Sequence, residues 1–149
     1  MKLTAVVRLQ PSVDQYRLLL ETLERANAAC AFISDAAWEV RQFGRVPVHR
    51  LTYQAVREQF GLTAQMAVRC IGKVGDAYKL DQKTKRTFHR HGAVPYDDRI
   101  LGWKVADRRV SIWTVAGREV IPFSCSDHHL QLLQHQRGES DLVYRGGKF

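Results

Sequence analysis

The side chains of this protein that could carry out chemistry do not form a recognisable catalytic set. Histidines gather at 89–91 and at 128–135, but no cysteine lies at the spacing from them that a zinc site requires. Asp97 and Asp98 are a candidate metal pair, yet adjacent carboxylates on a strand point to opposite faces. The sequence has no phosphate-binding glycine loop, nucleophile elbow or zinc-protease signature, and no set of three or four acids for a two-metal nuclease. We therefore expect no catalysis, no cofactor and no metal site in this chain by itself.

The spacing of the basic residues favours phosphate binding instead. Residues 41–90 contain eleven Lys or Arg and only three acids, a net charge of +8 that equals the net charge of the whole chain. Residues 1–40 carry −1 and residues 91–149 carry +1. Most of the block is Arg, whose planar guanidinium can contact two phosphate oxygens at once, and each neutralised phosphate releases counterions. The block therefore indicates a nucleic-acid partner; the alternative is a solvated basic face without a partner.

Length and composition indicate an ordinary globular protein. A chain of 149 residues, 45% hydrophobic and 26% charged, suits one domain or two small ones. No apolar run approaches the roughly 20 residues of a membrane-spanning helix, and Arg8 interrupts the N-terminal apolar pattern before a signal peptide could form. Cys30, Cys70 and Cys125 are odd in number and have no close pairing, which argues against a disulfide framework or a zinc ribbon. We expect a cytoplasmic prokaryotic protein with no membrane partner, in which Cys30 and Cys70 are core thiols.

The elements that must position the basic block are three helices. The periodicity of the apolar residues predicts them at about 13–42, 49–60 and 64–81, with a connector at 44–48. A capping box, Ser12 followed by Gln15, begins the first helix; Gly61 ends the second, and Thr63 caps the third.

The third helix has an apolar arc that must face the core and a polar arc opposite to it. The apolar arc holds Met66, Ala67, Cys70, Ile71, Val74, Ala77 and Tyr78, and the polar arc holds Gln65, Arg69, Gly72, Lys73, Asp76 and Lys79. A glycine within a helix costs about 0.8–1 kcal/mol relative to alanine. Gly72 therefore indicates either the close approach of another backbone or a helix crossing that needs a small residue.

The rest of the chain is predicted to form mainly strands. They are predicted at 2–10, 94–96, 100–105, 109–115, 118–123 and 141–144, with a hairpin turn at 116–117, a polar connector of some helical potential at 127–138 and a second turn at 145–148. The first strand has no neighbour before residue 94, so it must pair with later strands across the helices. We expect an α+β fold, a small β-barrel formed by residues 1–11 and 86–149 and interrupted after its first strand by a helical bundle, residues 12–85.

The hairpin at 145–148 lacks its returning strand, which would leave unpaired backbone groups. We expect that this sequence is the N-terminal piece of a longer protein; a natural terminus that frays or pairs with a partner chain is the alternative. The open edge near 141–149 predicts self-association.

Three runs of the sequence resemble a known family. The runs LTYQAVREQFGLTAQMAVRCIGKVGDAYK at 51–79, RTFHRHGAVPYDDRILGWK at 86–104 and DLVYRGGKF at 141–149 are similar to the N-terminal half of OrfB/TnpB-type insertion-sequence proteins. These proteins, long described as transposases, are RNA-guided DNA endonucleases related to the compact type V CRISPR effectors. The resemblance implies a wedge β-barrel interrupted by a helical recognition domain. The RuvC nuclease half, with its catalytic acids and divalent metal, has no counterpart in the 149 residues.

The resemblance therefore implies binding of guide RNA and of the target-adjacent DNA duplex without cleavage. For RNA it points to the basic side chains Lys83, Lys85, Arg86, Arg90, Arg108 and Arg109. For DNA it points to Tyr53, Arg57, Gln65, Arg69, Lys73, Tyr96 and Asp97. Two other functions remain open: a stand-alone regulator that binds nucleic acid without a nuclease, and a protein-interaction module whose basic face binds acidic partners.

Overall fold

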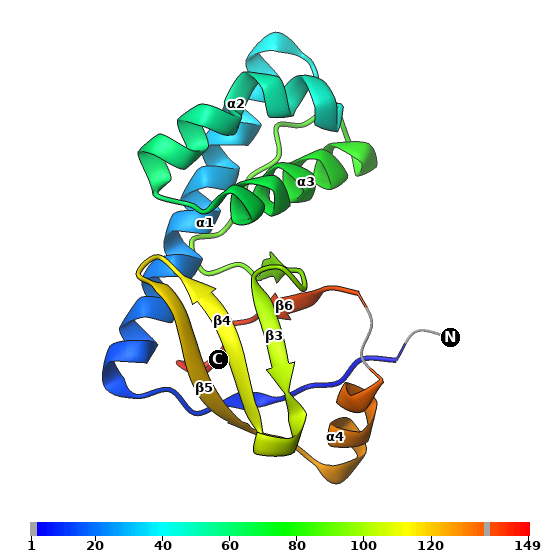
Figure 1. Cartoon of the computed structure of the whole chain (residues 1–149). Helices are drawn as coiled ribbons and strands as arrows, with labels where there is room; N and C mark the ends of the chain where they lie inside the picture. The colour runs from blue at the N-terminus through cyan, green and yellow to red at the C-terminus, as the bar shows by residue number, and fades with distance from the viewer. Residues whose placement is uncertain (1–2, 136–137) are drawn as a thin grey trace.

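The computed structural model describes residues 3–135 and 138–149 and has an α+β fold in two parts. Figure 1 shows a layer of helices at the top and a layer of strands below it. Helix α1, Val13–Val40, runs from the strand layer up into the helical layer, where α2, Arg45–Phe60, and α3, Ala64–Leu80, pack against it. None of the helices in the described part of the chain is long and apolar enough to span a membrane.

The predicted helices are confirmed, with one shifted boundary. Both hydrogen bonds of the capping box are present at the start of α1. The side chain of Ser12 accepts from the backbone N–H of Gln15, and the side chain of Gln15 accepts from the backbone N–H of Ser12. Helix α2 begins at Arg45 rather than at residue 49, because Pro47 falls in its first turn, where a missing backbone N–H costs nothing. Gly61 ends α2 with a φ of 64°, a left-handed conformation that glycine adopts without strain. Thr63 takes the cap position of α3, although its side chain makes no capping hydrogen bond.

The apolar arc of α3 is the core face, as predicted. Met66, Cys70, Val74 and Tyr78 are fully buried, while Ala77 is only partly so. Cys30 and Cys70 are buried where α1 meets α3, and the neighbouring Cys30 together with burial raises the pKa of the Cys70 thiol. Both thiols are therefore structural residues of the core.

The glycine of the polar arc makes room for a side chain. A Cβ added at Gly72 would lie 3.4 Å from Nη2 of Arg45, and one added at Gly75 would lie 3.4 Å from Cγ of the same residue and 3.8 Å from the carbonyl oxygen of Phe43. The start of α2 thus crosses α3 over these two glycines. The close approach predicted at Gly72 exists, but a guanidinium rather than a backbone fills it.

Strands from both ends of the sequence form the main sheet, in the order β1-β5-β4-β3. The strands are β1, Arg8–Leu9; β3, Leu101–Lys104; β4, Arg109–Thr114; and β5, Gly117–Ser124. Arg8 pairs with Ser124 in antiparallel register, so the prediction that the first strand pairs across the inserted helices is confirmed. Strand β1 is shorter than the predicted 2–10, and Val6 instead contacts the ring of His129 through its backbone.

A second, two-stranded sheet joins β2, Val94–Tyr96, to β6, Ser140–Leu142. A 3-10 turn, Val105–Asp107, separates β3 from β4, and helix α4, Asp127–Gln134, follows β5. The hydroxyl of Tyr96 links the two sheets by donating to the carbonyl of Trp113 at 2.8 Å. The amide of Leu9 in β1 donates to the carbonyl of Phe149, which lies outside both sheets, at 3.1 Å. Among the described residues the strands do not close into a single barrel.

The chain returns from α3 to the strands along the surface of α1, and Asn27 fixes its path. Asn27 is buried, and its side-chain amide donates to the carbonyls of Leu23, Arg90 and Gly92 at 3.0, 3.2 and 2.9 Å. Two of these three acceptors belong to the returning segment. The amide thereby satisfies backbone groups that no regular secondary structure pairs.

Replacing Asn27 with alanine should lower the free energy of unfolding by about 1–3 kcal/mol, because the partly buried carbonyls of Arg90 and Gly92 lose their donor. Urea denaturation followed by circular dichroism measures the change. The matched control is Gln54→Ala, which removes an exposed amide that donates to Glu58. Equal effects of the two substitutions would contradict the role given to Asn27.

Candidate nucleic-acid interface

Four of the six predicted RNA-binding residues lie on the segment that returns along α1, and three of these four have acidic partners there. Lys85 pairs with Asp35 at 2.6 Å, Arg86 with Asp81 at 3.5 Å, and Arg90 with Glu24. The hydrogen bond to Asp35 raises the pKa of Lys85. Ion pairs this exposed contribute about 0–1 kcal/mol each, so the cations can exchange a carboxylate for a phosphate at little cost.

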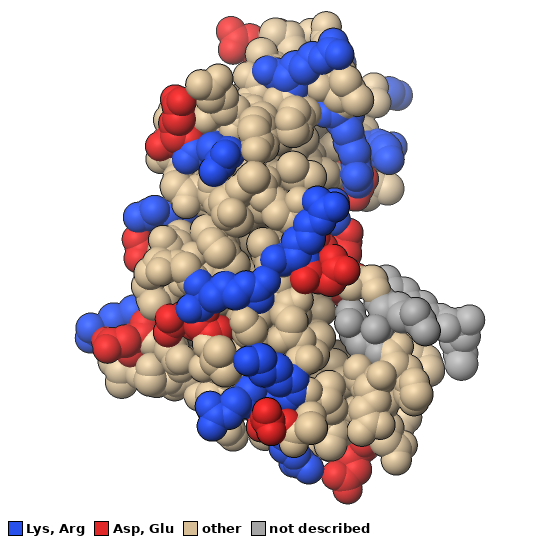
Figure 2. Space-filling model, in the orientation of Figure 1, with Lys and Arg blue, Asp and Glu red and all other residues tan. Residues whose placement is uncertain are grey.

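The other three, Lys83, Arg108 and Arg109, are exposed and have no carboxylate partner among the described residues. Arg109 is the cross-strand neighbour of Lys104, which is likewise unpaired. Three cations therefore gather around the β3–β4 connection, and the only acid there is Asp107. Figure 2 shows a group of basic side chains in that region, at the lower end of the strand layer. This basic turn is the most concentrated unneutralised charge of the strand layer.

The structure brings together four of the predicted DNA-binding residues, but it places them between the two layers. The amide of Gln65 donates to Asp97, whose carboxylate also pairs with Nε of Arg69 at 3.5 Å. Arg69 reaches Glu139 as well, and Lys73 donates to the carbonyl of Ala93 at 2.5 Å. The side chains of Arg69 and Asp97 are only 17% and 16% exposed. We call Gln65, Arg69, Lys73 and Asp97 the interlayer cluster, because they fasten α3 to the strands.

Beside the interlayer cluster lies a small hollow of about 250 Å³ whose charges are mixed. Its basic side chains are Arg45, Arg69 and Lys73, and its acidic ones are Asp76, Glu139 and Asp141. Arg45 pairs with Asp76 at 3.2 Å. The hollow is thus internally neutralised and offers a phosphate no net attraction.

Tyr96, another predicted DNA-binding residue, belongs to the core. It is completely buried, and burial raises the pKa of its hydroxyl well above the usual value. Strand β2 alternates buried, partly exposed and buried residues, so Tyr96 shares its inward face with Val94. Its side chain cannot contact a duplex in this structure.

The remaining pair, Tyr53 and Arg57, lies on α2 away from the interlayer cluster. Tyr53 stacks on His49, with ring centroids 4.5 Å apart and planes 16° apart, and the guanidinium of Arg57 lies 6.0 Å from the Tyr53 centroid. The three residues are spaced four apart, so they form one row along the helix. Arg50 and Arg57 are exposed and have no acidic partner in the described part of the chain. Our sequence analysis missed His49, although its spacing to Tyr53 and Arg57 is readable there.

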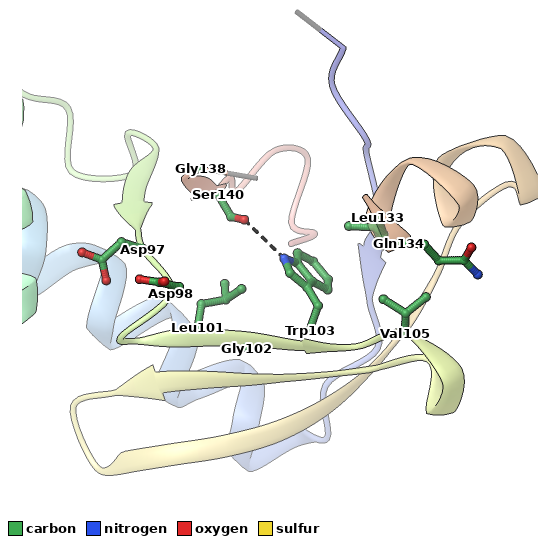
Figure 3. A pocket seen from close by; sticks show the side chains of 10 residues that line it. All are labelled: Asp97, Asp98, Leu101, Gly102, Trp103, Val105, Leu133, Gln134, Gly138 and Ser140. Carbon is green, nitrogen blue, oxygen red and sulfur yellow. Dashed lines mark hydrogen bonds between the residues drawn. The ribbon is translucent and has the colours of Figure 1, made fainter. Parts of the chain in front are cut away.

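A larger hollow, about 500 Å³ in volume, lies along β3 (Figure 3). Trp103 rises from the strand towards Ser140, while Leu133 and Gln134 approach from α4 and Asp97 and Asp98 lie at the opposite end. The indole N–H of Trp103 donates to Oγ of Ser140 at 3.4 Å. Within residues 3–135 and 138–149, no three His, Cys, Asp or Glu side chains come together as metal ligands.

The interlayer cluster gives a prediction that separates a structural role from a binding role. Asp97→Asn should lower the free energy of unfolding by about 1–3 kcal/mol, because Arg69 keeps its charge and loses a partly buried partner. Asp98→Asn is the matched control, since Asp98 is exposed and unpaired in the described residues. Thermal or urea denaturation measures both. If Asp97→Asn is as stable as Asp98→Asn, the cluster does not hold the layers together.

The sequence matches no protein-family model, and no curated protein matches it. The likeness to OrfB/TnpB-type proteins thus rests on the three runs at 51–79, 86–104 and 141–149. What this chain does must be inferred from the chemistry of its own surface.

Proposed function

We propose that this chain binds nucleic acid, as the non-cleaving N-terminal part of a TnpB-like RNA-guided DNA endonuclease. One observation carries the proposal: the +8 block at 41–90 is only partly neutralised within the fold. Arg50, Arg57 and Lys83 of that block are exposed without acidic partners, and the first two lie on the helix that carries the Tyr53–His49 stack. Cations beside partly exposed rings suit a ligand that combines phosphates with flat bases.

The two ligands of the proposal occupy different surfaces. The α2 row of His49, Tyr53 and Arg57 is the candidate contact for the target-adjacent duplex, because it is a helix face with unpaired arginines. Guide RNA is assigned to the basic turn and to the returning segment with Lys83, Lys85, Arg86 and Arg90. The ion pairs of that segment are weak enough to yield to phosphates.

We further propose that the strand layer is a wedge-type barrel that is incompletely closed. The hydrogen bond from Tyr96 to Trp113 supports this proposal, since it joins the two sheets. The bond from Leu9 to Phe149 supports it too, since it joins the main sheet to the segment that follows β6. The first strand and the last described residue would then be neighbours in one ring of strands.

The direct test is binding of the full chain to the RNA transcribed from the DNA flanking its own gene, against a scrambled RNA of equal length, at several salt concentrations. We expect tight, transcript-selective binding with a steep salt dependence, because phosphate contacts release counterions. Equal binding to both RNAs would show that the chain binds RNA only through its basic charge, without selecting the transcript. No binding to either would contradict the proposal and favour a protein-interaction module.

Individual phosphate contacts can be counted in the same assay. Arg108→Ala combined with Arg109→Ala should reduce the slope of log affinity against log salt by about 1.4–1.8, since each contact contributes roughly 0.7–0.9. Arg17→Ala is the control, because Arg17 is an exposed cation on the acidic N-terminal segment. An unchanged slope in the double variant would show that the basic turn does not contact the RNA.

A further inference from the structure

The hollow along β3 contains an aromatic ring whose position is fixed by its neighbours. Trp103 is partly exposed, its indole N–H donates to Ser140, and its ring packs edge-on against Phe123, with centroids 5.3 Å and planes 89° apart. Figure 3 shows that the ring stands up from β3 in the middle of the hollow. A side chain fixed in this way loses little conformational entropy when a second ring stacks on it.

The hollow has the size and the lining of a site for a small planar group. Its volume of about 500 Å³ lies within the range of ligand pockets, and Leu101, Val105 and Leu133 give it apolar walls. Oγ of Ser140 accepts a hydrogen bond from the indole N–H. Its hydroxyl donates to no acceptor among the described residues, so it can donate to a ligand. Gln134 adds an exposed amide that can donate and accept.

The two ends of the hollow differ in charge, and this determines how a nucleotide can enter. Asp97 and Asp98 line one end, and because Asp97 is paired with Arg69, it is the unpaired carboxylate of Asp98 that would repel a phosphate there. Val105 lines the other end, and its carbonyl accepts the backbone N–H of Arg108 at 3.1 Å, so the basic turn begins there. A nucleotide can therefore place its base in the hollow only with its phosphates towards Arg108.

We propose that this hollow binds one unpaired base of an RNA, stacked on Trp103, while the flanking phosphates contact the basic turn. The inference rests on the proposed RNA binding and adds to it a specific site that takes a single extruded base. Stacking requires a base but no particular sequence, and a purine covers more of the indole than a pyrimidine does.

The test compares two short RNA hairpins that carry the same number of phosphates. One has a single bulged adenosine and the other an abasic nucleotide at the same position, and fluorescence anisotropy measures the affinity of the full chain for each. We expect the bulged adenosine to bind about tenfold more tightly, the usual effect of one stacked base. Trp103→Leu should abolish this difference, whereas Trp113→Leu, on β4 outside the hollow, should keep it.

Removing the charge of Asp98 provides a second, independent test of the orientation. Asp98→Asn should leave the affinity for the bulged hairpin unchanged or raise it, because the substitution removes a repelling carboxylate. A tenfold loss in Asp98→Asn would overturn the proposed orientation, and with it the proposal.

The outcomes separate this inference from the proposed function. If wild-type protein binds both hairpins equally and with the same salt slope, RNA binding stands and the base site is overturned, with no variant needed. If neither hairpin nor the flanking transcript binds, both are overturned. If adenosine 5′-monophosphate alone binds as tightly as the bulged hairpin, the hollow is a site for a free nucleotide and the RNA proposal fails.

Discussion

Helix α1 has to serve two layers at once, and the other elements are placed by their contacts with it. Its N-terminal half lies against the strands and its C-terminal half against α2 and α3, as Figure 1 shows. Three buried polar side chains on α1 bind backbone groups of the segments that pack against it. Thr22 accepts the amide of Val115 at 3.0 Å, Asn27 holds the returning segment, and Ser34 donates to the carbonyl of Arg86 at 2.6 Å. Each satisfies a partly buried backbone group of another segment.

The same arrangement decides which charges of the basic block remain available. The acids of α1 lie opposite the returning segment, so Glu24 and Asp35 neutralise Arg90 and Lys85. Arg50 and Arg57 on α2 have no acidic partner among the described residues, and neither do the cations of the basic turn, which lies outside the block. Unpaired cations are therefore displayed at two separated places, which fits two nucleic-acid surfaces better than one continuous patch.

The helices were predictable because their signals are local. The capping box of Ser12 and Gln15, the glycine stop at Gly61 and the apolar arc of α3 each depend on residues within one or two turns. Strand β1 was predicted too long, since the alternation of residues 3–7 cannot reveal that His129 would bind the backbone of Val6. Likewise, the pairing of β1 with a later strand followed from topology, but the choice of β5 as its partner and the arrangement in two sheets depend on long-range contacts.

The candidate site was less predictable, for a related reason. A polar arc on a helix looks the same in sequence whether it faces solvent or polar groups of another layer. Gln65, Arg69 and Lys73 face the strands, and their partners Asp97, Glu139 and Ala93 lie 20 to 70 positions away. Tyr96 was placed on the surface although its strand register buries it. The stack of His49 on Tyr53 was not predicted, although the two residues lie four positions apart on α2, the spacing at which side chains on one helix face meet.

The interlayer cluster makes ligand binding and the relative position of the layers interdependent. A ligand that draws Arg69 or Lys73 towards a phosphate must replace contacts with Asp97, Glu139 and Ala93, and so it also releases α3 from the strands. The affinity of such a ligand is lowered by the free energy of the contacts that it replaces. By thermodynamic linkage, binding of the ligand weakens the contacts between the layers by the same free energy. A substitution that tightens the cluster weakens such a ligand, and such a ligand, once bound, loosens the layers by the same amount.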